Sequence, residues 1–157
     1  MKLTDFVVRR AIIPNLQAAD RNGVIRELVK SLSDAAALPG EDVEAVTRAV
    51  IQRENQGSTG FGKGVAVPHV KHVKVPKIIS AIGRSAGGVD FAALDRAPVF
   101  SVVVLLSPPD HPDGHLQAME NIFRQLQRDD FRRFLRQAET ADAIWELIEE
   151  ADGQPVG

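Results

Sequence analysis

The sequence predicts a single α/β domain in which a mixed β-sheet is flanked by α-helices. Segments with apolar residues at helical spacing alternate with short apolar runs that have the length of strands. The run at residues 99–106 is nearly continuous in Val and Leu, which is typical of a strand buried on both faces by helices. A length of 157 residues suits one domain with a substantial core, and no internal repeat or linker divides the chain.

Two helices are expected in the first third of the chain. An amphipathic opening at residues 3–10 is followed by a strand-like segment at residues 11–16. Asp20 is placed to cap a first helix, which the Leu-Pro-Gly at residues 38–40 ends. Acidic residues 41, 42 and 44 favour the amino-terminal dipole of a second helix, which runs to about residue 56. The apolar positions of the two helices recur at helical spacing: Val24, Ile25, Leu28, Val29 and Leu32, then Val43, Val46, Val50 and Ile51.

Strands and then helices are expected in the rest of the chain. The strand candidates are residues 65–67, 78–84 and 99–106, with turn signals at Gly87-Gly88 and at residues 95–98. A loop with three prolines covers residues 107–114, and a helix is expected to start at His115 with an apolar side that begins at Leu116. A short helix at 131–138 and a last helix capped by Thr140 follow. The domain is expected to span residues 1–152, with a flexible tail at 153–157.

Composition excludes several functional classes. Nineteen basic and 21 acidic residues leave no electrostatic footprint for nucleic acid or a membrane surface. The absence of cysteine excludes disulfides, thiol catalysis and thiolate metal sites. The amino terminus lacks the apolar core of a signal peptide, and the longest apolar run is too short to span a bilayer. These features predict a cytoplasmic protein with no nucleic-acid partner and no direct membrane insertion.

Residues 53–69 are the stretch around which the chain is organised. Four glycines fall within residues 57–64, and a short apolar run then leads to Pro68 and His69. Residues 57–63 spell G-x-x-x-x-G-K, but Gly64 stands where a phosphate-binding loop needs Ser or Thr. A helix precedes this loop and a strand follows it, which reverses the order that nucleotide binding requires. The pattern instead predicts a flexible turn, a buried strand and an imidazole at the end of that strand.

The four histidines are the candidates for chemistry. His69 is expected at the rim of the sheet and His115 at a helix start, where unpaired N–H groups attract anions, although either could be a structural residue. An imidazole that is mostly neutral at pH 7 can act as nucleophile, ligand or base. A metal site would need i, i+4 spacing with a nearby Glu, which neither His69-x-x-His72 nor residues 111–115 provide. His72 and His111 are therefore expected to be solvated, with no metal and no cofactor.

Arg53 and the first residues of the turn are candidates for phosphate contacts. A guanidinium just before a glycine turn can hold a phosphoryl oxygen bidentately, although Arg53 could equally contact the last helix carbonyls. Ser58, Thr59 and Gly60 could add hydroxyl or backbone donors, and simple turn residues are the alternative.

These motifs together resemble a known family. Arg53-Glu54, the string S-T-G-F-G-K-G-V-A-V-P-H at residues 58–69 and Gly114-His115-Leu116 resemble the IIA domains of the bacterial phosphotransferase system, in the fructose/mannitol/nitrogen-regulatory class. The resemblance is nearly full length and extends to Val89-Asp90-Phe91. Phe61 and Val70 depart from the family's usual residues, which are Ile and a small residue.

The resemblance implies a phosphohistidine phosphocarrier. It implies that His69 is phosphorylated by the small histidine-containing phosphocarrier protein and passes the group to a IIB domain, or uses it as a regulatory signal. It also implies that His115 is the second active-site histidine and that Arg53 binds the phosphate. From the residues themselves, Ser58, Thr59 and Gly60 are expected to bind or support the phosphate.

Other interpretations stay open at this point. No IIB or IIC region is expected in this chain, which favours the regulatory branch over sugar transport. A binding module of the same fold that has lost transfer is one alternative, and a metal-dependent hydrolase is another.

Overall fold

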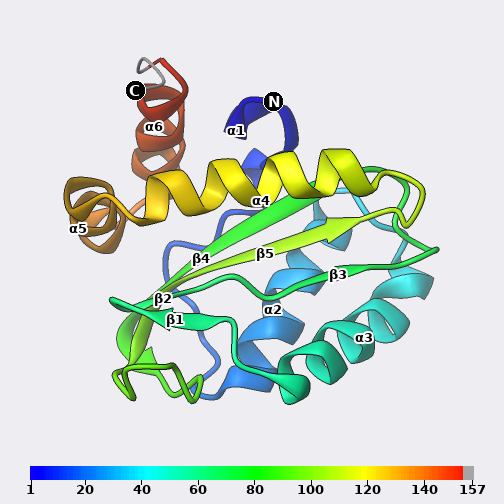
Figure 1. The fold of residues 1–157 in the computed structure, drawn as a ribbon, viewed down its shortest axis with the longest axis horizontal. Helices are drawn as coiled ribbons and strands as arrows, with labels where there is room; N and C mark the ends of the chain where they lie inside the picture. The colour runs from blue at the N-terminus through cyan, green and yellow to red at the C-terminus, as the bar shows by residue number, and fades with distance from the viewer. Residues whose placement is uncertain (154–157) are drawn as a thin grey trace.

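The computed structural model describes residues 1–153, and these form the predicted α/β arrangement of a mixed sheet between two layers of helices (Figure 1). The expected tail lies outside the described residues apart from Gly153. The elements are α1 (Leu3–Phe6), η1 (Arg9–Ala11), α2 (Arg21–Asp34), η2 (Gly40–Asp42), α3 (Val43–Gln56), β1 (Gly60–Gly62), β2 (Val65–Ala66), β3 (His69–Lys71), β4 (Ile79–Val89), β5 (Val99–Ser107), α4 (Pro112–Leu126), α5 (Asp129–Gln137) and α6 (Ala141–Asp152).

Strand β5 is the centre of the sheet. β4 pairs antiparallel with one of its edges, with Ile79 opposite Leu106. β2 and then β3 run parallel along the other edge, so that His69 lies opposite Leu105. β1 pairs antiparallel with β2 at the outside. His69 is thereby placed on the last stretch of the sheet before β5 ends at Ser107.

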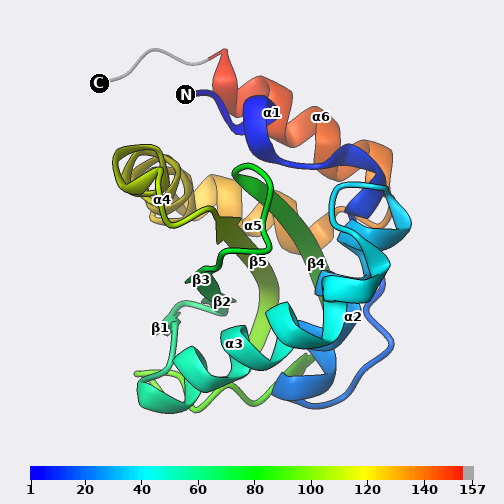
Figure 2. The same cartoon turned by 90° about the vertical axis from the view of Figure 1, so that its right-hand side faces the viewer.

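Alternate residues of β5 face the two helical layers, as the apolar run at 99–106 predicted. Val102, Val104 and Leu106 belong to the core shared with α2 and α3. Val103 and Leu105 belong to the core shared with α1, α4, α5 and α6. Figure 2 shows these two groups of helices on opposite sides of the sheet. The expectation of a strand buried on both faces is confirmed.

Side chains cap three of the helices. Asp20 accepts the Gly23 N–H at 3.1 Å and Thr140 accepts the Ala143 N–H at 3.1 Å, which confirms both predicted caps. Asp152, at the end of the last helix, accepts the N–H groups of residues 3 and 4 at 2.8 and 2.9 Å. The start of the described chain is thus tied to its end, and α1 lies beside α6 (Figure 2).

Two predictions about the sheet were wrong in detail. The segment at 11–16 is not a strand: it begins in a 3₁₀ turn and pairs with β4 through an isolated bridge at Ile13. Beyond that bridge, the Leu16 N–H donates to the Arg84 carbonyl at 2.9 Å, so the segment contacts β4 without forming a ladder. The predicted turn at Gly87-Gly88 lies within β4, where the register shifts. Gly88 has φ 82°, and a Cβ there would meet Pro98 at 2.8 Å, so glycine suits this bulge.

The helix expected to start at His115 starts at Pro112 instead. Proline is well suited to the first helical position, because its φ is preset and its missing N–H would have no partner there. The prediction treated Pro112 as a loop residue. His115 consequently lies inside the first turn of α4, and its own N–H donates to the carbonyl of His111 at 3.0 Å.

Candidate functional site

His69 is held in one orientation by the backbone next to it. Its Nδ1 lies 2.7 Å from the carbonyl oxygen of Val67, two residues earlier. A carbonyl can only accept, so Nδ1 carries the proton and donates it. In the neutral ring, Nε2 then bears the lone pair, and this nitrogen is the nucleophilic atom of the side chain.

The fold brings His115 beside His69, although the two are far apart in the sequence. Their ring centroids are 5.8 Å apart with an angle of 49° between the planes. Nδ1 of His115 lies 2.7 Å from Oγ of Ser107, a fully buried residue at the end of β5. If the Ser107 hydroxyl donates to this nitrogen, Nε2 of His115 carries the proton and is a donor. Ser107 was not singled out from the sequence, because only the contact between β5 and α4 reveals it.

Both imidazoles are held neutral at pH 7. Desolvation is the main cause for each: it lowers the pKa of His69, against the Val67 carbonyl and Glu54, which raise it. Desolvation, followed by the charge that His69 gains when it is protonated and the charge of Lys71, lowers the pKa of His115 to about 4. A neutral His69 keeps its lone pair available for attack.

Arg53 lies within electrostatic range of His69, near the end of α3. Its positive charge is one of the causes that lower the His69 pKa. Its Nη1 donates to the carbonyl of Gly57 at 2.9 Å, so the guanidinium is anchored to the glycine turn. The alternative of a contact with a carbonyl at the helix end is therefore observed, and the guanidinium also lies within electrostatic range of His69.

The donors of the glycine turn are largely engaged by the turn itself and by the residues packed against it. The Ser58 hydroxyl donates to the carbonyl of Phe91 at 2.7 Å and accepts the Gly60 N–H at 3.0 Å. The N–H and hydroxyl of Thr59 both donate to the carboxylate of Glu54, at 2.9 Å to Oε1 in each case. Ser58, Thr59 and Gly60 thus hold the shape of the turn with these groups.

Glu54 is a site residue that the sequence reasoning missed. Its carboxylate is 2 % exposed and is the acceptor that organises the turn. It also acts electrostatically on His69 by raising that residue's pKa. The signal available in the sequence was the Arg53-Glu54 pair immediately before the glycines, in which only the arginine was given a role.

The two histidines open onto a shallow depression of about 630 Å³ along α4. Its apolar side chains are Leu116, Met119 and Phe123, and Leu116 is 58 % exposed. Phe61 of β1 packs against Phe123 with ring centroids 5.0 Å apart, so the larger residue at position 61 is accommodated by α4. Val70 packs against the opposite core, on the side of α2 and α3, so it faces away from this depression.

The other two histidines do not join the pair. His111 is exposed beside Asp110, as predicted. His72 is half-buried rather than fully solvated, and its Nδ1 accepts the Lys74 N–H at 3.1 Å. Within residues 1–153, no group of three or more His, Asp or Glu side chains is arranged to hold a metal ion. In the same residues, no helix is both long and apolar enough to cross a membrane.

Comparison with known proteins places this three-layer domain among the domains of the phosphotransferase system. The family model described as "Phosphoenolpyruvate-dependent sugar phosphotransferase system, EIIA 2" matches residues 5–151. The chain belongs to this family, and the resemblance drawn from the motifs is confirmed.

Individual relatives fall into two groups. The chain is 36 % identical to a nitrogen regulatory protein of Bradyrhizobium diazoefficiens, over 94 % of this chain and 95 % of the relative. It is 35 % identical to a fructose-specific EIIABC component of Bacillus subtilis, over 97 % of this chain but 24 % of that relative.

Among solved structures, the nitrogen regulatory protein IIA-Ntr of Neisseria meningitidis superimposes with a TM-score of 0.81 at 25 % identity. That match covers 92 % of this chain and 97 % of the other.

Proposed function

We propose that the protein is a phosphocarrier that accepts a phosphoryl group on Nε2 of His69 and delivers it to another protein. The observation that carries the proposal is the hydrogen bond from Nδ1 of His69 to the Val67 carbonyl. It fixes the tautomer so that the unprotonated nitrogen is the one left to react. Burial keeps the ring neutral, which preserves that lone pair.

The transfer step needs no metal or nucleotide in its bond changes. The Nε2 lone pair attacks the phosphorus of a phosphohistidine on the donor, a new N–P bond forms, and the donor's N–P bond breaks with its electron pair returning to the donor ring. The Nδ1 proton stays on His69, so the phosphorylated ring carries positive charge. The Val67 carbonyl and Glu54, which both raise the pKa of His69, stabilise that charge.

His115 and Arg53 are proposed to stabilise the phosphoryl oxygens. Neutral His115, with Nδ1 accepting from Ser107, donates from Nε2, and the anchored guanidinium of Arg53 supplies charge. Ser58, Thr59 and Gly60 support the turn that carries Arg53's anchoring carbonyl. The role assigned to these three is therefore support of the turn.

The depression along α4 is proposed as the surface where protein partners bind in turn. It is shallow, it contains the exposed Leu116, and it leads directly to both histidines. The proposed donor is the histidine-containing phosphocarrier protein. The proposed acceptor is a IIB domain, because a structurally similar mannitol IIA of Escherichia coli was solved in complex with phosphorylated mannitol IIB. A regulatory target is the other acceptor class, suggested by the nitrogen regulatory relatives.

Phosphorylation in a defined mixture tests the proposal. The protein is incubated with phosphoenolpyruvate, enzyme I and the histidine-containing carrier, and its mass is measured. We expect an acid-labile gain of one phosphoryl group that His69→Ala abolishes and that the control variant His72→Ala, altered just after the same strand, retains. A stable label on another residue, or full labelling of His69→Ala, would refute it.

The use of the phosphoryl group is tested separately. If the phosphorylated protein drives sugar uptake by membranes that contain a sugar permease, its role is in transport. A tight complex formed with a target by only the unphosphorylated protein indicates regulation instead.

A further inference from the structure

A second depression lies towards the other end of β5 from the histidines. It has a volume of about 520 Å³ and lies between the β1–β2 turn, the start of β5 and α5. Val65 of its wall pairs with Ser101, whereas His69 pairs with Leu105. Four residues along β5 correspond to roughly 13 Å at the rise of an extended strand. The second depression is therefore separate from the site proposed for phosphoryl transfer.

The lining of this second depression is strongly basic, although the whole chain has a net charge of −2. Lys63, Arg132, Arg133 and Arg136 line it together with one acidic residue, Asp129. Asp129 already forms an ion pair with Arg132, so three cations remain without a carboxylate partner in the lining. On α5 the arginines are spaced i, i+3 and i, i+4, which places like charges side by side and destabilises an isolated helix. An anion bound among them would relieve this repulsion.

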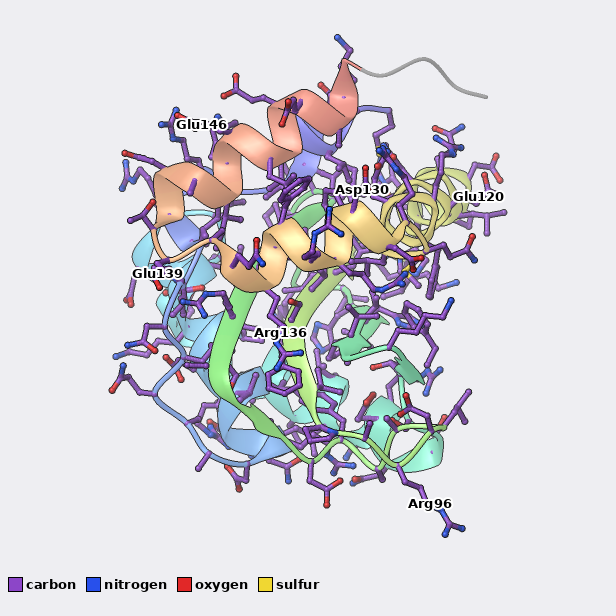
Figure 3. The ribbon with its side chains drawn as sticks, turned by 90° about the vertical axis from the view of Figure 1, so that its left-hand side faces the viewer. Arg96, Glu120, Asp130, Arg136, Glu139 and Glu146 are labelled. Atoms are coloured by element: carbon purple, nitrogen blue, oxygen red, sulfur yellow. The ribbon has the colours of Figure 1, made fainter. Side chains whose placement is uncertain are left out.

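Two of the guanidinium groups are positioned by aromatic rings. Cζ of Arg136 lies 3.6 Å from the centroid of the Phe100 ring, and Cζ of Arg133 lies 5.1 Å from that of Phe134. At the 3.6 Å separation of Arg136 from Phe100, the guanidinium contacts the ring by its flat face, which leaves its in-plane N–H donors available. Within residues 1–153, the side chains of Arg133 and Arg136 make no hydrogen bond or ion pair. Figure 3 shows Arg136 extending from α5 toward the strands, away from Glu120 on α4.

Lys63 is the one cation of the lining that does not come from α5; it belongs to the β1–β2 turn. It occupies the β1–β2 turn with φ 61°, a left-handed conformation that glycine or asparagine adopts more readily than lysine. The turn is fixed in place because the Lys63 N–H donates to the carboxylate of Asp95 at 3.0 Å. A charged side chain is thus presented to the depression from a rigid turn.

We propose that this second depression binds a small molecule bearing a phosphate group, of the phosphomonoester or diphosphate class. Arginine forks match phosphate oxygens bidentately, and a lysine adds a compact charge. The volume is within the range of small-molecule sites. The half-buried Phe100 supplies apolar surface for the organic part of the ligand. The proposal does not depend on phosphorylation of His69.

Amide chemical shifts during titration with pyrophosphate, and separately with inorganic phosphate, test the proposal at low ionic strength. We expect saturable shifts at Lys63, Gly64 and Ser101, with pyrophosphate binding more tightly than phosphate because it carries more charge. Lys63→Asn removes the charge while suiting the left-handed turn, and Arg136→Gln removes one guanidinium. Each substitution is expected to weaken pyrophosphate binding at least tenfold.

Arg96→Asn is the matched control for Lys63→Asn. Arg96 is exposed, also has φ 61°, and lies outside the lining of the depression. Its substitution removes the same charge in the same backbone conformation and should change affinity less than twofold. If Lys63→Asn and Arg96→Asn weaken pyrophosphate binding equally, the binding depends only on the overall charge of the protein and the proposal is overturned. Shifts confined to His69 and Arg53, or a hexaglutamate peptide that binds these residues more tightly than pyrophosphate, would also overturn it.

Discussion

At position 54 a buried carboxylate organises the glycine turn and acts electrostatically on the imidazole of the proposed nucleophile. Replacing Glu54 with Gln keeps the shape of the side chain. It removes the negative charge of the carboxylate that accepts hydrogen bonds from the N–H and hydroxyl of Thr59. We expect a loss of about 1 to 2 kcal/mol in the free energy of unfolding, because charge-assisted bonds to a buried acceptor are weakened. Urea denaturation measures this directly.

The same substitution should lower the pKa of His69, because Glu54 is one of the groups that raise it. The pKa is read from the imidazole proton shifts as a function of pH. Glu44→Gln on the same helix is the control, since Glu44 is exposed and its ion pairs are with arginines alone. A His69 pKa that does not change in Glu54→Gln would contradict the electrostatic role.

His115 makes the stability depend on pH in a predictable direction. Its pKa is about 4 in the folded protein and near 6.5 when unfolded, so between these values the unfolded chain binds a proton that the folded chain does not. The contribution of His115 to the free energy of unfolding is therefore fully present above pH 6.5 and is lost as the pH is lowered toward 4. Burial of His69 acts in the same direction.

The His115 contribution is isolated with a variant. Between pH 7 and pH 5, wild type should lose about 1 kcal/mol more unfolding free energy than His115→Gln, a figure reduced from the full shift because the ring is partly solvated. Urea titrations of both proteins at the two pH values measure the difference. Equal losses would show that His115 takes up its proton without cost in the folded state.

At the level of elements, the sequence predicted those features that depend on neighbouring residues, such as helix caps and buried strands. Asp20 and Thr140 indicated helix starts, and the run at 99–106 indicated a strand covered on both sides. The start of α4 was misplaced because Pro112 was interpreted as a break, although proline is equally suited to a first helical position.

Features of the site that depend on tertiary contacts were out of reach of those local signals. The bond from His115 to Ser107 joins α4 to β5, and nothing about either residue alone indicates it. His69 could be placed at the end of a strand, but its proximity to His115 follows from β3 pairing beside β5 while α4 covers the same edge. The family resemblance supplied the pairing of the two residues, and the fold supplies its geometry.

The exposed face of α4 gives a prediction about partner binding. Leu116 is 58 % exposed in the depression beside the histidines, so Leu116→Gln should leave the unfolding free energy unchanged within about 0.5 kcal/mol. If partners bind there, the substitution should raise the KM for the phosphorylated carrier protein several-fold, with a smaller change in kcat, because apolar contact area is lost. Steady-state phosphorylation assays separate the two constants.

Leu94→Gln is the matched control for this experiment. Leu94 is 77 % exposed on the loop before β5 and does not line the depression. An increase of KM in Leu94→Gln that equals that of Leu116→Gln would place the partner surface elsewhere.

For the whole molecule, β5 is the element through which the two cores are coupled. Its successive residues enter opposite helical layers, and it pairs with β4, β2 and β3. Neither core can open without disturbing this strand, so the two layers are expected to unfold together. Leu135 of α5 is 1 % exposed and belongs to the core on the α4 to α6 side alone.

Leu135→Ala should therefore weaken both layers equally. The cavity it leaves is expected to cost about 2 to 5 kcal/mol of unfolding free energy. Amide hydrogen exchange should accelerate by the same factor at Leu28, in the opposite core, as at Ile148 in its own, because both amides exchange through the same global opening. Acceleration confined to the helices around Leu135 would show instead that the layers open separately, and that β5 with α2 and α3 can stay folded while the helices over the histidine pair come away.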